Sequence, residues 1–354
     1  MRATLDGGSA MGTTIRVPPP WFRLFVITPI VFVACVVVTV LSPALHLVLV
    51  LIDLVDRKRW RFSRVGGLGI AVCVCELIGL VMAFVLWVAS GFGWAIRRPA
   101  FQHAHHVAFG WYLELLTRAL RFYLGFRIEW VERERVDGPV VALARHAGPG
   151  DAFLLARTAM RDYGRRVRML GTTKLLWDPV MDRLMRRLPY YFCEPSPERL
   201  DDHLTAIGEM CRTLDDDGVL IIFPEGGNWT PGRWSREVER LVALGLHERA
   251  ERMATTMTHV MPPRSSGAIA ALQARDDVAL TFVVHVGLDD LHSLRQIWRS
   301  VPLGRTVLGG YWSVPLDEVP HDPDEMRSWL FDRWEEVDRW IADRKADAFG
   351  HDDG

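Results

Sequence analysis

A histidine and an aspartate, five positions apart, follow directly after a short apolar segment. Residues 140–144 read Val-Val-Ala-Leu-Ala, then come Arg145 and His146, a Gly-Pro-Gly turn at 148–150, and Asp151 at the start of a helical pattern. A carboxylate bound to one imidazole nitrogen fixes the tautomer and stabilises the charge that forms when the other nitrogen takes a proton. The pattern predicts His146 as a general base acting on a substrate hydroxyl, with Asp151 as its partner. A plain helix start at Asp151 is the structural alternative.

A second apolar segment also ends in a polar turn. Residues 221–230 read Ile-Ile-Phe-Pro-Glu-Gly-Gly-Asn-Trp-Thr, so Glu225, Gly226, Gly227 and Asn228 follow a predicted buried strand. Ligands of α/β sheets usually bind where strands end at one edge, and glycine lets a polar ligand approach the backbone closely. These four residues are therefore predicted to bind substrate. An ordinary surface turn with a solvated glutamate is the alternative.

The elements that position these turns alternate between short strands and helices. Apolar runs predict strands at 126–136, 139–144, 218–223 and 278–286. Helical spacing is found at 101–124, 152–163, 179–188, 199–215, 267–274 and 325–345. This alternation predicts an α/β fold with a mostly parallel sheet flanked by helices.

The first hundred residues differ in character from the rest. Residues 1–20 form a polar tail, and residues 21–100 contain two apolar runs, 22–54 and 67–95, joined by a basic loop at 57–64. Each run is long enough to cross a bilayer, which predicts membrane-anchoring helices; two buried core helices are the alternative. The domain at 101–354, with its C-terminal helix, follows.

The basic loop raises a question of topology. Basic loops mark the cytoplasmic side, yet two single crossings would then place residues after 100 outside. Hairpins with turns at Pro43 and at residues 91–93 remove the conflict. We therefore expect the loop and the α/β domain on the cytosolic face of the inner membrane.

Composition excludes several other classes. A net charge of −1 offers no basic field for nucleic acid. The 5 cysteines form no Cys-x-x-Cys pair, and no zinc-type spacing is present, so neither a metal site nor a cofactor is predicted. The histidines at 103, 105 and 106 are interpreted as an interfacial polar patch. No Gly-x-Ser-x-Gly elbow is found, which disfavours a serine hydrolase.

Together, the two polar turns resemble signature blocks of the glycerolipid (lysophospholipid) acyltransferase family, H-x4-D and F-P-E-G. Three further segments are similar to the family: Gly171 with Lys174-Leu175-Leu176 and Asp178-Pro179, then Tyr191-Phe192, then Met-Pro-Pro-Arg-Ser-Ser-Gly at 261–267. The last resembles the form seen in the lysocardiolipin-acyltransferase-like branch. The resemblance covers roughly residues 125–345.

The resemblance implies an O-acyltransferase that moves a fatty acyl group from acyl-CoA or acyl carrier protein to the free hydroxyl of a lysophospholipid, such as 1-acyl-glycerol-3-phosphate. His146 would deprotonate the hydroxyl and Asp151 would orient His146. The turn at 225–228, together with Arg264 and Lys174, would bind the acceptor. Membrane phospholipids, the acceptor and the acyl donor are the expected partners. Backbone amides near residues 148–150 are a candidate oxyanion site.

One departure from the family pattern leaves more than one acceptor lipid in consideration. The family's third block often continues Gly-Thr-Arg, whereas this chain has Gly227-Asn228 and lacks that phosphate-binding arginine. A glycolipid or another bulky acceptor is therefore an alternative to lysophosphatidate. A catalytically silent membrane lipid-binding scaffold is an alternative of another class, disfavoured because His146, Asp151 and Glu225 are all present.

Overall fold

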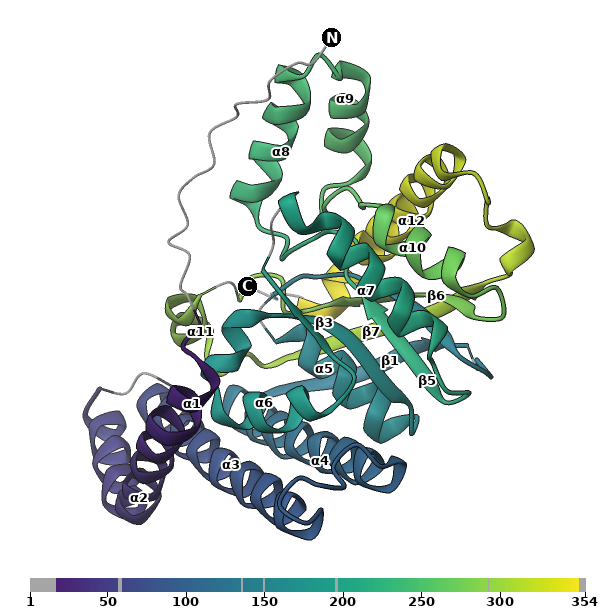
Figure 1. Ribbon diagram of the computed structural model, residues 1–354. Coiled ribbons are helices and arrows are strands. Elements are labelled where there is room, and N and C mark those ends of the chain that lie inside the picture. Colours follow the sequence, from purple (N-terminus) through teal and green to yellow (C-terminus); the bar gives the residue numbers. More distant parts are fainter. Residues whose placement is uncertain are drawn as a thin grey trace.

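The computed structural model describes residues 17–56, 59–134, 136–148, 150–194, 197–291 and 293–349. Residues 1–16 of the predicted polar tail lie outside this range, as do two residues of the basic loop, Arg57 and Lys58. The described chain forms one seven-stranded sheet with helices on both faces (Figure 1). The predicted α/β class is confirmed.

The sheet is mostly parallel. Its strands are β1 (Phe126–Arg133), β2 (Val140–Ala144), β3 (Arg166–Thr172), β4 (Tyr191–Cys193), β5 (Gly218–Ile222), β6 (Ala279–Val286) and β7 (Arg305–Val314). They lie in the order β1-β7-β6-β2-β5-β3-β4, and only β6 and β7 pair antiparallel. Every residue of the central strands β2 and β5 is buried, because helices cover both faces of the sheet there.

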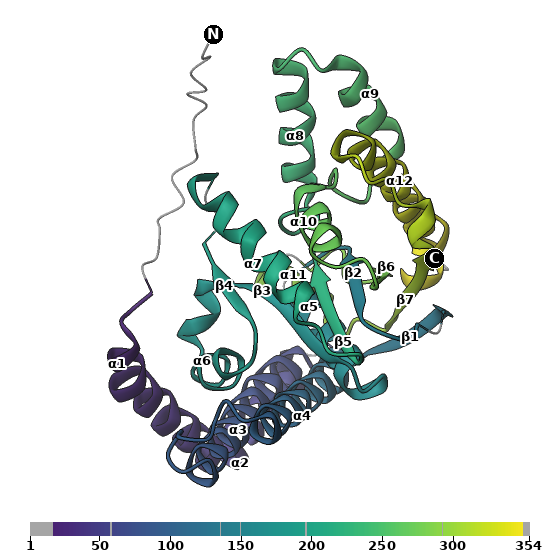
Figure 2. The ribbon, with the colours of Figure 1, turned by 45° about the vertical axis from the view of Figure 1, so that its right-hand side comes forward.

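Helices cover the two faces in separate groups (Figure 2). One face carries α3 (Arg61–Ala89), α4 (Pro99–Leu124), α5 (Asp151–Arg157) with the π-turn η2 (Thr158–Asp162), and α6 (Pro179–Leu184) with the 3₁₀ turn η4 (Met185–Arg187). The other face carries α7 (Leu200–Arg212), α10 (Ser266–Ala274) and α12 (Pro323–Phe349), with α8 (Pro231–Ala243) and α9 (His247–Thr256) beyond them. Apart from the first apolar run, the remaining elements are α11 (Leu294–Ser300), η3 (Thr173–Trp177), η5 (Pro197–Arg199) and η6 (Leu316–Glu318).

All four strands predicted from the sequence are present, and β3, β4 and β7 are additional. Strand β7 has the glycine pair Gly309-Gly310, which weakens a strand signal. The structure gives a reason for both glycines. A Cβ added at Gly309 would lie 2.7 Å from the Trp130 ring, and one at Gly310 would lie 2.8 Å from the Trp340 ring. The strand therefore uses glycine to admit two indole rings.

The apolar runs form two long helices rather than a hairpin each. After α1 (Pro20–Phe22) and a π-helical turn η1 (Arg23–Ile27), helix α2 (Thr28–Asp56) continues through Pro43 without a break, so the predicted turn at Pro43 is wrong. Proline is tolerated in apolar helices of this kind. The chain reverses instead between α2 and α3, where the Asp53 carboxylate accepts the backbone N–H of Phe62 and Ser63 at 3.1 and 2.7 Å. The turn predicted at residues 91–93 does lie between α3 and α4.

Two described helical segments, Pro20–Asp56 and Arg61–Ala89, are long and apolar enough to cross a membrane by length and composition. The start of each segment contacts the α/β domain. Arg23 forms an ion pair with Asp182 of α6, at 3.2 Å. Arg61, the first residue of α3, donates to the carbonyls of Arg299 and Val301 at 2.9 and 3.2 Å. The helix pair therefore lies along the domain (Figure 1).

Candidate active site

His146 and Asp151 meet between β2 and α5. The Nδ1 atom of His146 lies 2.9 Å from Oδ1 and 3.0 Å from Oδ2 of Asp151. The Asp151 side chain is buried, whereas the His146 side chain is 22% exposed. Its ring also packs on Phe223, with centroids 4.6 Å apart. Because Nδ1 faces the carboxylate, Nε2 is the nitrogen available to a substrate.

Asp151 is held by the turn as well as by the histidine. Gly150, with φ of 111°, precedes α5, and the Asp151 carboxylate accepts the N–H of Ala147 and Gly148 at 2.7 and 3.0 Å. Burial alone would raise the pKa of Asp151, but His146 and His285 beside it hold that pKa well below its usual range. The carboxylate therefore stays charged. The amides of Ala147 and Gly148 are engaged, so they do not serve the predicted oxyanion site.

A second histidine, which the sequence reasoning missed, lies on the other side of Asp151. His285 Nε2 is 3.5 Å from Asp151 Oδ2, and the side chain is 2% exposed. Neither ring nitrogen of His285 has a hydrogen-bond partner among the described residues. The signal in the sequence was a histidine interrupting the apolar strand at 278–286, next to the carboxyl end of β2.

Glu225 joins two loops rather than facing solvent. Its Oε1 accepts the backbone N–H of His146 at 2.8 Å, and its Oε2 accepts that of Met261 at 2.9 Å. Burial raises the pKa of Glu225 to about 7, although Arg145 and the two N–H donors stabilise its charged form. Both oxygens are thus used inside the protein, which favours a positioning role over the acceptor contact that the family resemblance implies.

Arg145, immediately before His146, is a fully buried cation. It forms an ion pair with Asp289 and donates to the carbonyls of His285 and His259 at 2.7 and 2.8 Å. Burial would raise the pKa of Asp289, but Arg145 lowers it to about 2. This pair ties the end of β2 to the loop after β6, and so fixes the strand ends that carry the two histidines.

Two guanidinium groups lie against the glycine turn. A Cβ at Gly226 would lie 3.2 Å from the guanidinium of Arg264, and one at Gly227 would lie 2.8 Å from that of Arg233. Arg233 donates to the carbonyls of Asn228 and Glu225, each at 3.1 Å. Burial, followed by the neighbouring charge of Arg264, lowers the pKa of Arg233. Arg233, which the sequence reasoning did not identify, therefore supplies a guanidinium at the turn where Asn228 does not.

The other predicted residues lie on η3 and α4. Lys174 is exposed in η3, just after β3, which is the neighbour of β5 in the sheet. The interpretation of an interfacial polar patch is wrong for His105, which is buried and contacts the Phe101 carbonyl at 2.7 Å; His106 contacts the carbonyl of Arg165 at 3.0 Å. Within the described ranges no group of three or more His, Cys, Asp or Glu residues could hold a metal ion.

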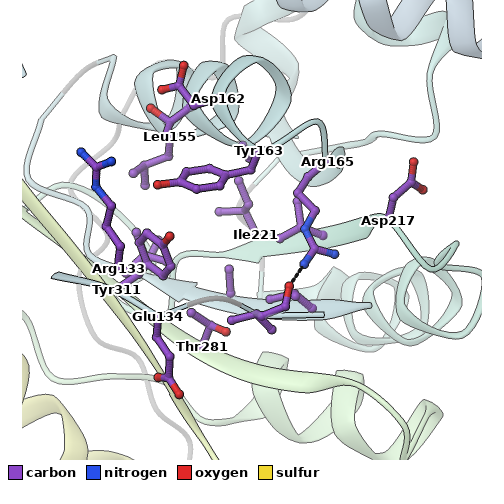
Figure 3. A pocket seen from close by; sticks show the side chains of 18 of the residues that line it. Arg133, Glu134, Leu155, Asp162, Tyr163, Arg165, Asp217, Ile221, Thr281 and Tyr311 are labelled. Atoms are coloured by element: carbon purple, nitrogen blue, oxygen red, sulfur yellow. Dashed lines mark hydrogen bonds between the residues drawn. The ribbon is translucent and has the colours of Figure 1, made fainter. Parts of the chain in front are cut away.

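A cavity of about 770 Å³ lies between the sheet and α5–η2. Figure 3 shows Leu155 and Tyr163 on one side of it and Ile221 and Thr281 on the other, with charged side chains around its rim. Its sheet wall includes Ala144, Ile221 and Val283. Side chains alternate along strands, so the next ones on this face are His146, Phe223 and His285. The cavity thus extends along the sheet towards the strand ends that carry the candidate site, although His146 and Asp151 themselves do not line it.

Residues 125–283 match the family model described as Acyltransferase. The chain is also similar to an uncharacterised acyltransferase of Schizosaccharomyces pombe, with 24% identity over 179 residues, 47% of this chain and 48% of the relative. The chain therefore spans about half the length of the curated relative that it matches. Neither match identifies the branch within the family. The matched segment contains the histidine–aspartate pair and the glycine turn, so this part of the chain is an acyltransferase domain.

Proposed function

We propose that the protein transfers a fatty acyl group from an acyl thioester, acyl-CoA or acyl carrier protein, to the free hydroxyl of a lysophospholipid. The observation that carries this proposal is the His146–Asp151 pair, in which Nδ1 is held by a charged carboxylate and Nε2 is left for a substrate. His146 takes the proton of the acceptor hydroxyl, and the oxygen attacks the thioester carbonyl. The C–O bond forms, the C–S bond breaks, and the leaving thiolate receives the proton.

The cavity supports a fatty acyl group as the transferred unit. Its volume lies in the range of about 300–1,000 Å³ common for small-molecule sites. Its walls near the pair are apolar, formed by Ala144, Leu155 and Val283 among others. A thioester carbonyl at His146 would let the attached chain run along this face of the sheet, where it is removed from water.

The two arginines support an acceptor with an anionic headgroup. Arg233 and Arg264 lie against the turn at 226–227, which begins three residues beyond Phe223, and Phe223 packs on His146. Guanidinium groups bind phosphate oxygens through paired, charge-assisted hydrogen bonds. A lysophospholipid phosphate bound there, with Lys174 one strand away along the edge, agrees with this charge. These arginines can bind the phosphate in place of the family arginine that Asn228 replaces, so lysophosphatidate is again a candidate acceptor.

The helix pair supports attachment to a membrane with the basic turn and the α/β domain on one side. Arg61 and Arg64 near the reversal contact the carbonyls of Arg299, Val301 and Tyr123 of the domain. Large apolar side chains of α2 are exposed along its length, among them Val40 and Val55. We expect the domain to face the cytosol of the inner membrane, where acyl thioesters are found.

The test is to incubate the purified chain with radiolabelled acyl-CoA, or acyl carrier protein, and a panel of lysophospholipids and glycolipids. Acyl transfer predicts labelled ester product and free thiol in equal amounts. Labelled free fatty acid without ester would indicate a hydrolase, and no turnover of any pair would favour a lipid-binding scaffold. Either result would refute the proposal.

A further inference from the structure

A cluster of arginines surrounds one buried carboxylate where the N-terminal helix meets α6. Asp182 contacts Arg183 at 2.7 Å, Arg23 at 3.2 Å and Arg186 at 3.3 Å. Arg187 follows in the chain and donates to the carbonyl of Ala83 at 2.8 Å. Four positive charges therefore meet one negative charge.

The excess positive charge contributes to lowered pKa values of individual arginines. Burial, followed by the neighbouring charges of Arg186 and Arg23, lowers the pKa of Arg183. Burial, followed by the charge of Arg183, lowers the pKa of Arg187 to about 10. The Nε atoms of Arg23 and Arg183 are buried without an acceptor among the described residues. The cluster has more donors and more charge than the protein around it satisfies, which favours binding of an anion.

Three of these arginines line a cavity together with apolar side chains. The cavity, of about 360 Å³, is lined by Arg183, Arg186, Arg187 and the carboxylate of Asp182 on α6 and η4, and by Pro20, Trp21, Leu24 and Phe25 at the start of the first apolar segment. Trp21 and Phe25 are 61% and 71% exposed at the start of the first apolar segment, Pro20–Asp56. Tryptophan at the end of an apolar helix is typical of the membrane–water interface. Charged and apolar side chains thus line the same cavity.

We propose that this cavity binds the phosphate of an anionic membrane phospholipid, with the acyl chains of that lipid lying along Trp21, Phe25 and the exposed side of α2. Arginine suits this ligand because its planar donors match phosphate oxygens. The apolar wall continues onto α2, which a lipid chain can follow and a soluble phosphate or an acidic peptide cannot. None of these residues belongs to the turns that hold His146 and Asp151, so the site is separate from acyl transfer.

Native mass spectrometry of the detergent-purified full chain tests the proposal without measuring activity. Phosphatidylglycerol, phosphatidylcholine with the same chains, and glycerol 3-phosphate are added separately. Wild type is expected to retain phosphatidylglycerol in preference to the other two. Arg183→Gln/Arg186→Gln should bind phosphatidylglycerol at least about tenfold more weakly, because two charge-assisted contacts are lost. Trp21→Ala/Phe25→Ala should also weaken lipid binding.

Arg327→Gln/Arg339→Gln is the matched control, because it removes two exposed arginines from α12, far from α1 in Figure 1. It should bind phosphatidylglycerol as wild type does. Arg186→Gln alone guards against misfolding, since Asp182 keeps Arg23 and Arg183; it should show an intermediate loss. Equal binding of the two phospholipids, or wild-type affinity in Arg183→Gln/Arg186→Gln, would overturn the proposal. Glycerol 3-phosphate binding as tightly as the lipid would assign the site to a soluble phosphate instead.

Discussion

Replacing Glu225 by glutamine distinguishes a positioning residue from an acceptor ligand. Each carboxylate oxygen accepts one backbone N–H, from His146 at 2.8 Å and from Met261 at 2.9 Å. A glutamine of the same shape keeps one acceptor oxygen and turns an NH₂ group towards the other N–H. One buried donor then has no acceptor, whichever way the amide is oriented.

The size of the effect follows from that orphaned donor. A buried N–H without an acceptor costs about 1–3 kcal/mol. One of the two donors is the backbone N–H of His146. A shift of its loop therefore also displaces the His146 ring and its Nε2 atom. A loss of about 1.4 kcal/mol in transition-state stabilisation is about tenfold in kcat. We therefore expect Glu225→Gln to lower thermal stability and to reduce kcat about tenfold or more, while the KM for the acceptor changes little.

The assay measures kcat and KM for both substrates together with the melting temperature in detergent. Glu237→Gln is the matched control, since it removes a carboxylate paired with Arg240 on the surface of α8, where such pairs contribute about 0–1 kcal/mol. It should leave both measurements nearly unchanged. If Glu225→Gln keeps wild-type stability and kcat but raises the acceptor KM, the glutamate contacts the acceptor. That result would refute a positioning role for Glu225.

Three further predictions follow from the same contacts. Folding raises the pKa of Glu225 from 4.5 to about 7, so the folded state holds this proton more tightly than the unfolded state. As pH rises between these values, wild type should lose about 3 kcal/mol of stability relative to Glu225→Gln. Urea unfolding at pH 4.5 and 7.5 measures this, and an equal change in unfolding free energy in the two proteins would contradict it. Arg264→Ala should raise KM for anionic acceptors about tenfold and leave neutral acceptors unaffected; equal changes for both would remove Arg264 from phosphate binding. His285→Phe should lower kcat about tenfold with unchanged KM, because Asp151 loses a polar neighbour; wild-type kcat would show that His285 only fills space.

Four of the seven strands, and the first pair of site residues, could be predicted because their signals are local. Each apolar segment before a polar turn, at residues 140–144 and 218–223, is a buried central strand of a parallel sheet. The contact between His146 and Asp151 follows from a short turn, so spacing alone indicates it. Strand β7 was missed because Gly309 and Gly310 break the apolar pattern, and the indole rings that require them lie far away in the sequence.

The rest of the site depends on contacts between distant segments. Arg233 lies in the first turn of α8, and its guanidinium points back to Gly227, a contact that no local sequence pattern indicates. His285 reaches Asp151 only because β6 pairs with β2. The turn predicted at Pro43 was wrong for a different reason. A proline breaks a helix in water, but a long apolar helix can continue through it.

The most direct test of the central claim is the rate of acyl transfer by His146→Ala beside wild type, with labelled acyl-CoA and the acceptor that wild type uses best. Loss of a general base is expected to lower kcat by about 10²–10⁴-fold, with acceptor binding preserved. His103→Ala, which removes an exposed histidine of α4, should retain wild-type kcat. Transfer by His146→Ala at a rate near that of wild type would contradict the account, because no proton would then pass through His146.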